Sequence, residues 1–225
     1  MSTVPFKIKR QFSPDMDPYW ERFELPHMPN SNVISYLMDI RKNPVNADGV
    51  KVPPIVWDCS CLEEVCGTCT MRINGQVRQS CSALVDKLKW PIVLEPMSKF
   101  PVVRDLCVDR SRLFRALERV KAWVPVDDSY DHGPGPRVSP EEQEDAYPLS
   151  QCMSCGCCLE ACPQYTKIDL TQRDDESDDA FEKRKNEAYD SGFVGAHAVS
   201  QTMLFNSHPI GKMITDERLE AVTSQ

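Results

Sequence analysis

Four cysteines in the first third of the chain have a spacing that can bind a metal cluster. They are Cys61, Cys66, Cys69 and Cys81, and they follow the pattern C-x4-C-x2-C with a distant fourth cysteine. This is the spacing of plant-type [2Fe–2S] sites, whose loop curls so that amide N–H groups point at the sulfurs, which favours Gly67. Zinc bound through Cys66 and Cys69 is the alternative, but zinc gives no reason for the four-residue gap.

A second group of cysteines has the spacing of a bacterial ferredoxin. Cys152, Cys155, Cys158 and Cys162, followed by Pro163, form C-x2-C-x2-C-x3-C-P. In bacterial ferredoxins the fourth cysteine of such a run ligates a different cluster from the first three. No cysteine follows the last of them, so the run leaves two clusters short of ligands. A single [4Fe–4S] cluster held by all four thiolates is the alternative.

The remaining candidates for metal binding have simpler interpretations. Cys59 lies just outside the first pattern, and we predict that it is a small buried hydrophobic residue. The histidines show no metal-ligand spacing among themselves. We predict that His132, His197 and His208 are ordinary surface or loop residues.

Composition excludes several classes of protein. The chain has 225 residues and a formal net charge of −8, which argues against nucleic acid as a partner because phosphate binding needs a basic face. No apolar run reaches the roughly 18 residues of a membrane span, and the N-terminus resembles neither a signal nor a transit peptide. The 11 cysteines are clustered in a chain without secretory features, which indicates metal binding in a reducing, cytoplasmic compartment.

The N-terminal part of the sequence is typical of a mixed α/β unit. Residues 6–12 and 20–26 alternate like a strand hairpin, and residues 31–43 have helical spacing with Ser31 or Asn32 as N-cap. Further strands are predicted at 53–58, in a hairpin over 70–81 around Asn74–Gly75, and at 90–96.

The pattern becomes helical near residues 100–108. Ser139 and Pro140 can begin one of these helices, as N-cap and first helical residue. A loop rich in proline and glycine is expected at residues 131–140. The predicted helices cover residues 108–123, 140–152, 195–209 and 215–225, and the highly charged residues 175–188 are expected to form a solvated helix or a flexible surface segment.

Taken together, these motifs resemble the iron–sulfur subunit of succinate dehydrogenase/fumarate reductase, respiratory complex II. The matching segments are "WDCSCLEEVCGTC", "LEPMSKFPVVRDLCVDRSRLF", "KAWVPVD", "GPGPR" and "CMSCGCCLEACP". The resemblance implies an α+β fold: an N-terminal β-grasp, plant-type ferredoxin-like domain over residues 1–106, then an all-helical, bacterial-ferredoxin-like domain over residues 107–225.

The resemblance also implies three clusters and their ligands. Cys157 matches a position that is not a ligand. Family members continue into a third cysteine group, so we expect this sequence to be truncated at its C-terminus before that group. The implied ligands are Cys61, Cys66, Cys69 and Cys81 for [2Fe–2S], Cys152, Cys155 and Cys158 for [4Fe–4S], and Cys162 for [3Fe–4S].

The implied function is an electron relay. The chain would be a subunit of succinate dehydrogenase (quinone)/fumarate reductase that binds no substrate and passes single electrons between an FAD-containing flavoprotein and membrane quinone. The resemblance implies haem-bearing membrane anchor subunits, which would hold it at the cytoplasmic face of the cell membrane.

The implied quinone is menaquinone rather than ubiquinone, near Pro163 and Gln164. Many members have a tryptophan shortly after the Cys-Pro, and this chain has none there. The alternatives are an iron–sulfur subunit of another flavin oxidoreductase and a zinc-stabilised, non-redox scaffold.

Overall fold

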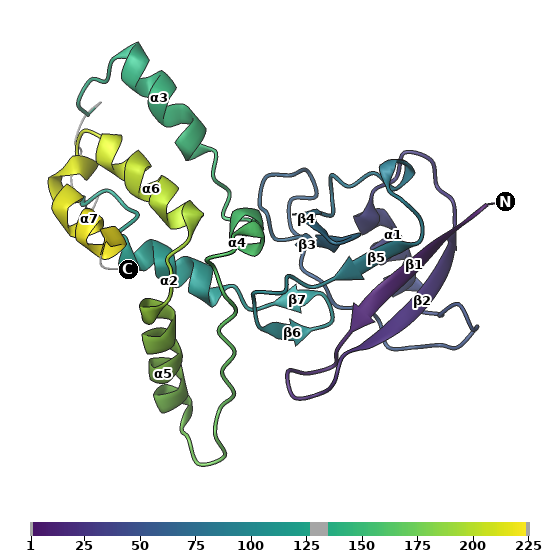
Figure 1. Cartoon of the computed structure of the whole chain (residues 1–225). Coiled ribbons are helices and arrows are strands. Elements are labelled where there is room, and N and C mark those ends of the chain that lie inside the picture. The colour runs from purple at the N-terminus through teal and green to yellow at the C-terminus, as the bar shows by residue number, and fades with distance from the viewer. Residues whose placement is uncertain (1, 127–134, 224–225) are drawn as a thin grey trace. The chain divides into compact units, whose positions relative to one another are not determined.

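A five-stranded sheet forms the N-terminal part of the structure, a computed structural model that describes residues 2–126 and 135–223 (Figure 1). The strand order is β2-β1-β5-β3-β4; β1 and β5 are parallel, and the other neighbours are antiparallel. Both predicted hairpins and the predicted last strand are confirmed. The strands are β1 Thr3–Arg10, β2 Tyr19–Pro26, β3 Thr70–Ile73, β4 Gln76–Gln79 and β5 Ile92–Glu95.

The chain divides into two compact units. The first is Met1–Arg110 together with Cys155–Ala161, and the second is Ser111–Ser154 together with Cys162–Gln225. The finer division into domains of residues 1–106 and 107–225 stays a prediction.

Helix α1, Val33–Lys42, packs on the sheet and closes its core. Of the two predicted N-caps, Asn32 is the one used: its side chain accepts a hydrogen bond from the Ser35 amide at 3.0 Å. The same side chain donates to the Cys81 carbonyl at 2.8 Å. The cap that begins the helix therefore also holds the backbone of the last cysteine in the first group.

Strand β1 brings a charged residue into this core. Val4, Phe6 and Ile8 alternate toward the buried side, and the same two-residue period places Arg10 there with no exposed surface. A buried guanidinium needs a partner for each of its donors, because an unpaired buried charge is costly. Arg10 therefore depends on acceptors from other segments.

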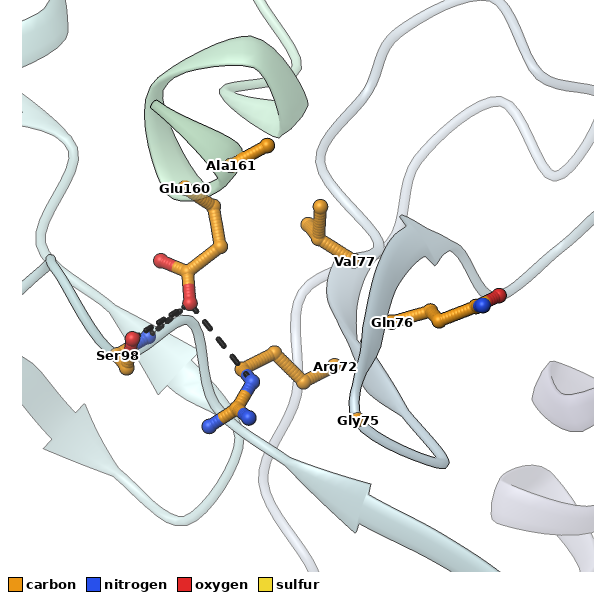
Figure 2. A pocket seen from close by; sticks show the side chains of 7 residues that line it. All are labelled: Arg72, Gly75, Gln76, Val77, Ser98, Glu160 and Ala161. Carbon is orange, nitrogen blue, oxygen red and sulfur yellow. Dashed lines mark hydrogen bonds and ion pairs between the residues drawn. The ribbon is translucent and has the colours of Figure 1, made fainter. Parts of the chain in front are cut away.

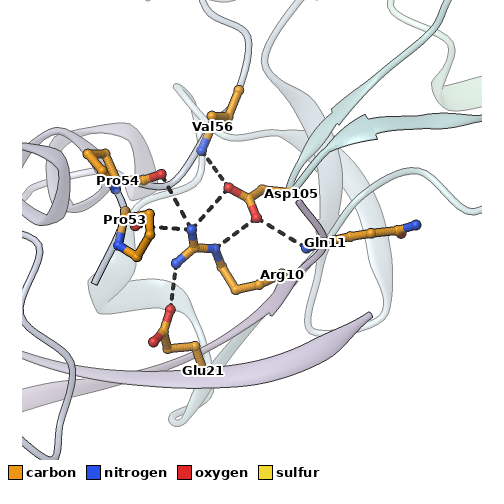
Figure 3. Close-up of polar contacts among 7 residues, drawn as sticks. All are labelled: Arg10, Gln11, Glu21, Pro53, Pro54, Val56 and Asp105. Atoms are coloured by element: carbon orange, nitrogen blue, oxygen red, sulfur yellow. Dashed lines mark hydrogen bonds and ion pairs between the residues drawn. The ribbon is translucent and has the colours of Figure 1, made fainter. Parts of the chain in front are cut away.

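Asp105 is the main acceptor for Arg10 (Figure 3). Arg10 Nε donates to Asp105 Oδ1 at 2.8 Å, and Arg10 Nη1 is paired with Glu21. The Asp105 carboxylate also accepts the amides of Gln11 and Val56, at 3.1 and 3.0 Å. This buried network joins β1, β2, the segment before the first cysteine group, and the turn between strands β6, Val102–Arg104, and β7, Cys107–Val108.

The strand predicted at residues 53–58 is wrong, because this segment pairs with no ladder. Its two prolines, Pro53 and Pro54, have no N–H to donate to a neighbouring strand. Their carbonyls instead accept hydrogen bonds from Arg10 Nη2, at 3.1 and 3.4 Å. These bonds, together with one from the Leu106 amide to the Val56 carbonyl at 3.1 Å, hold the segment outside any sheet.

Four short elements complete the first unit. The hairpin of β6 and β7 contains Asp105, which has a positive φ of 49°. The bounds are η1 Val85–Lys87, β6 Val102–Arg104, β7 Cys107–Val108 and α4 Cys157–Ala161.

Helices make up the described part of the second unit. The four helices predicted there are confirmed, with ends that differ by several residues, and of the two alternatives for residues 175–188 the helix is the one observed. The loop predicted at 131–140 lies partly outside the described residues. Ser139 caps α3 as predicted, in a capping box with Glu142. The helices are α2 Ser111–Arg119, α3 Pro140–Ser150, α5 Asp178–Ser191, α6 Ala196–Ser207, η2 Gly211–Ile214 and α7 Thr215–Thr223.

The second unit packs α2 against α6 around a small apolar core. Its buried members are Ala116, Val120, Val194 and Ala198. Nowhere in residues 2–126 and 135–223 is there a helix long and apolar enough to cross a bilayer.

Candidate metal centres

The loop from Cys61 to Cys69 is shaped by three left-handed residues. Leu62, Glu64 and Gly67 have φ values of 62°, 63° and 69°, which turn the chain repeatedly within a few residues. The consequence is a nest of amides around Cys61, whose Sγ accepts from the amides of Glu63, Val65 and Cys66. The two shortest of these bonds, from Val65 and Cys66, are 3.3 Å. Amides aimed at a ligand sulfur are the donors that tune the potential of an iron–sulfur cluster.

The first two cysteines of the group form a pair. The Cys61 amide donates to Cys66 Sγ at 3.5 Å, and the Thr68 hydroxyl lies 3.1 Å from the same sulfur. The hydrogen bond from Cys61, followed by those from Thr68, lowers the pKa of Cys66 to about 6. Cys66 is therefore largely a thiolate at neutral pH, the form that ligates iron.

The last two cysteines form a second, more buried pair. Cys69 and Cys81 are both buried, and their thiols are hydrogen-bonded to each other. Burial, followed by that hydrogen bond, raises the pKa of Cys81 to about 11. Ser80 reinforces the pair, because its amide and hydroxyl both donate to the Cys69 carbonyl, at 3.2 and 2.9 Å.

Two pairs of thiols fit a two-iron cluster. In a [2Fe–2S] centre each iron takes two of the four protein thiolates. The pairs Cys61–Cys66 and Cys69–Cys81 supply that donor set, with amide donors already directed at the first pair. Within the described residues, no three or more His, Cys, Asp or Glu side chains gather closely enough to hold a single metal ion.

The second cysteine run begins with a similar turn. Ser154 and Gly156 have positive φ values of 53° and 83°, and α4 starts directly after them at Cys157. A hydrogen bond from the Cys157 thiol, opposed by burial, lowers the pKa of Cys155 to about 6. The same bond, followed by burial, raises the pKa of Cys157. Cys155 is therefore the better thiolate of the two, in line with its predicted role as a ligand.

The other three predicted ligands of this run are at or near the surface. Cys158 is exposed and belongs to the first unit with Cys155, whereas Cys152 and Cys162 belong to the second unit. The assignment of these cysteines to [4Fe–4S] and [3Fe–4S] stays a prediction.

Sequence reasoning missed Arg110, which contacts both cysteine runs. Its guanidinium donates to the carbonyls of Gly67, Thr68 and Cys155. Burial lowers the pKa of Arg110, although the nearby negative charge of Asp58 and of cysteine thiolates opposes this. An isolated arginine has no spacing signal, so nothing local in the sequence distinguishes it from a surface cation.

Two predictions about single residues are wrong. Cys59 is exposed rather than buried, because it follows the buried Trp57 where the chain leaves the core. His197 is not a surface residue: it is 3% exposed, and its Nε2 lies 3.1 Å from the Leu113 carbonyl. Its position on α6, on the face that meets α2, buries it.

The remaining predicted residues have the following positions. His208 is exposed, and His132 lies outside the described residues. Pro163 and Gln164, predicted to lie near quinone, are both exposed, and their role stays a prediction.

A surface pocket lies beside the β3–β4 hairpin, and no cysteine lines it (Figure 2). Glu160 of α4 closes one side. Its carboxylate accepts from the Ser98 amide and hydroxyl at 2.8 and 2.6 Å and from the Lys99 amide at 3.1 Å, with Arg72 Nε 3.8 Å away. These bonds satisfy the carboxylate, so we interpret Glu160 as the attachment of α4 to the sheet.

Comparison with known proteins agrees with these observations. Residues 5–115 match the family described as a 2Fe-2S iron-sulfur cluster binding domain. The chain is 52% identical over 223 residues to a succinate dehydrogenase iron-sulfur subunit of Bacillus subtilis, covering 99% of this chain and 79% of that protein. A fumarate reductase iron-sulfur subunit of Wolinella succinogenes is 27% identical, over 64% of this chain and 59% of that protein.

A solved structure shows that the fold is shared. A chain of the Mycobacterium smegmatis Sdh1 complex in the apo form has a TM-score of 0.65 and 18% sequence identity, covering 96% of this chain and 81% of that one. The resemblance predicted from the cysteine motifs is confirmed by the Bacillus relative. The chain belongs to the family of iron–sulfur subunits of succinate dehydrogenase and fumarate reductase.

Proposed function

We propose that this chain carries electrons between an FAD-containing flavoprotein subunit and membrane quinone in a succinate dehydrogenase/fumarate reductase. The observation that carries the proposal is the pairing of Cys61 with Cys66 and of Cys69 with Cys81, in a chain of this family. An iron–sulfur cluster, when bound, takes up and releases one electron at a time.

The first unit is proposed to be a β-grasp, plant-type ferredoxin-like domain. The parallel pairing of β1 with β5 at the centre of the sheet, and α1 packed on it, support this. Cys61, Cys66, Cys69 and Cys81 would hold [2Fe–2S] there. The chain's own contribution is to direct amides at Cys61 and to keep Cys69 and Cys81 away from water.

The second cysteine run is proposed to serve the two other clusters, within an all-helical, bacterial-ferredoxin-like domain. Cys152, Cys155 and Cys158 would ligate [4Fe–4S], and Cys162 would ligate [3Fe–4S]. Each of these clusters needs more thiolate ligands than the cysteines assigned to it here. The lowered pKa of Cys155 supports its part in this assignment.

The partners follow from the relatives' names, which describe subunits of larger enzymes. We assign an FAD-containing flavoprotein to the side that exchanges electrons with succinate or fumarate. A haem-bearing membrane anchor would hold the assembly at the cytoplasmic face of the membrane. Menaquinone, near Pro163 and Gln164, would complete the path.

The test is isolation of the full-length protein from its membranes with whatever subunits accompany it. We expect a flavoprotein and an anchor subunit, succinate–quinone reductase activity, and the paramagnetic signal of a reduced [2Fe–2S] cluster. Zinc in place of iron would contradict the proposal, because a zinc scaffold carries no electrons. A soluble flavoenzyme partner without succinate activity would contradict the assignment of partners.

A further inference from the structure

Arg110 is bonded to both cysteine runs at once. Its Nη1 donates to the Gly67 carbonyl at 2.8 Å and to the Cys155 carbonyl at 3.4 Å. Its Nη2 donates to the Thr68 carbonyl at 2.6 Å. Gly67 and Thr68 are the two residues between the ligand positions Cys66 and Cys69. The guanidinium therefore joins the first cluster loop to Cys155, the second cysteine of the second run.

The two segments that Arg110 joins are in direct contact. A Cβ atom on Gly67 would lie 2.6 Å from the Cα and Cβ atoms of Cys155, so the backbones touch with no room for a side chain. A fork with fixed geometry can hold such a contact, because its donors bond three carbonyls in set directions. Arg110 is thus placed to hold the Gly67–Thr68 segment at a fixed distance from Cys155 within the first unit.

The charge of Arg110 is not neutralised by these bonds. All three acceptors are main-chain carbonyls, which carry no formal charge, and its Nε is buried without a hydrogen-bond partner among the described residues. The carboxylate of Asp58 and the thiols of Cys155 and Cys69 are close enough to act on it electrostatically, and none of the three is hydrogen-bonded to its Nη1 or Nη2 in the bonds above. A cation buried beside thiolate ligands stabilises added negative charge, because the low dielectric strengthens the interaction.

We propose that Arg110 is a positioning residue that clamps the [2Fe–2S] loop onto the second cysteine run and raises the reduction potential of the [2Fe–2S] cluster. Reduction adds an electron to this site, so a fixed positive charge favours the reduced state. The inference rests on the proposed function, since it takes Cys69 and Cys155 to be cluster ligands.

The test compares variants of the full-length protein in its assembled membrane complex. Arg110→Met removes the charge and the fork, while Arg110→Lys keeps the charge and loses the fork. Arg22→Met is the matched control, because it removes a charge from a side chain that is 68% exposed and pairs with Asp48. The readouts are the midpoint potential of the [2Fe–2S] signal in a redox titration and the broadening of that signal by neighbouring paramagnetic clusters.

We expect a lower midpoint potential in Arg110→Met, recovery of most of it in Arg110→Lys, and no shift in Arg22→Met. Both Arg110 variants should show altered broadening, because the clamp is lost in each. An unchanged midpoint in Arg110→Met would overturn the role of the charge, as would an equal fall in Arg110→Lys. Unchanged broadening in both would overturn the clamp.

Two further results keep the outcomes distinct. If Arg110→Met does not assemble, Arg110→Gln replaces it, since the amide keeps hydrogen-bond donors without the charge, and an unshifted midpoint there overturns the proposal equally. If the unmodified complex lacks a [2Fe–2S] signal, the proposed function itself fails. If the unmodified complex has a normal [2Fe–2S] signal and the midpoint potential is unchanged in the Arg110 variants, only the role of Arg110 is rejected.

Discussion

Gly67 lies against Cys155 so closely that only a glycine fits. A Cβ atom on Gly67 would be 2.6 Å from two atoms of Cys155, and the backbone of Gly67 has a φ of 69°, which L-residues rarely adopt. The close contact with Cys155 and the positive φ each require glycine at position 67. The first cysteine loop therefore contacts Cys155 of the second run through the backbone of Gly67.

Gly67→Ala should reduce both stability and cluster content. The left-handed backbone alone costs an alanine roughly 1–2 kcal/mol, and the contact with Cys155 must also open. Gly75→Ala is the control, because Gly75 has a φ of 81° but nothing within 4 Å of a new Cβ. Iron per polypeptide and the thermal unfolding midpoint measure the difference. Equal losses in the two variants would show that the contact has no effect.

Asp105→Asn should destabilise the first unit strongly. The variant leaves the buried Arg10 without its main counter-charge, and breaking a buried pair costs about 3–5 kcal/mol. Asparagine tolerates the positive φ at this position, so the charge is the main change. Denaturant unfolding measures the loss.

The control for this prediction is an exposed ion pair. Asp48→Asn removes the partner of Arg22, where both side chains are about two-thirds exposed, and should cost about 0–1 kcal/mol. A similar small loss in Asp105→Asn would mean that the carboxylate in Figure 3 holds nothing in place.

Glu160→Gln should loosen α4 from the sheet. The carboxylate accepts three hydrogen bonds from Ser98 and Lys99, and hydrogen bonds to a charged group contribute about 1.5–3 kcal/mol each. Hydrogen exchange of the amides in residues 157–161 is the measurement, with faster exchange expected in the variant. Glu24→Gln, at an exposed position on β2, serves as the control. Identical protection in both variants would argue against this attachment.

Cys66→Ala should abolish the [2Fe–2S] paramagnetic signal, because it removes one of the four paired thiols. Cys59→Ala should leave that signal intact, since Cys59 is exposed and is assigned to no cluster. Low-temperature spectra of the reduced protein compare the two. A [2Fe–2S] signal that survives in Cys66→Ala would show that the ligand assignment is wrong.

His197 should make the second unit sensitive to acid. Burial lowers the pKa of His197, with the bond to Leu113 opposing it, so the folded state favours the neutral ring. The unfolded chain then binds more protons. Stability is complete above the unfolded pKa of about 6.5 and falls as pH drops below it, by at most about 1.4 kcal/mol per pH unit.

The variant His197→Gln isolates this effect, because glutamine does not titrate and can still donate to the Leu113 carbonyl. The urea concentration at the unfolding midpoint is measured at pH 7.5 and at pH 5.5. The decrease between the two pH values should be smaller in the variant than in the unmodified protein. Parallel losses in the two proteins would assign the acid sensitivity to other groups.

Local patterns in the sequence determined much of the first unit and the helices of the second. Asn74–Gly75 predicted a hairpin, and Ser139–Pro140 predicted the start of a helix. The cysteine spacings indicated the family. Each of these signals acts through atoms a few residues apart: a turn's φ angles, a cap's hydrogen bond, or thiolates on one loop. Such interactions are encoded within a short window, so a single sequence reveals them.

The tertiary structure alone decided which charged and polar groups are buried, and where. Arg10 and Asp105 are 95 positions apart, and Arg110 joins residues 42 to 45 positions away. The sequence predicts His197 at the surface, and it lies inside. It predicts a strand at residues 53–58, which instead bond to the side chains of Arg10 and Asp105 and to the Leu106 amide. A buried charge is stable only where distant segments supply its partners, and which segments meet is set by the packing of the whole core.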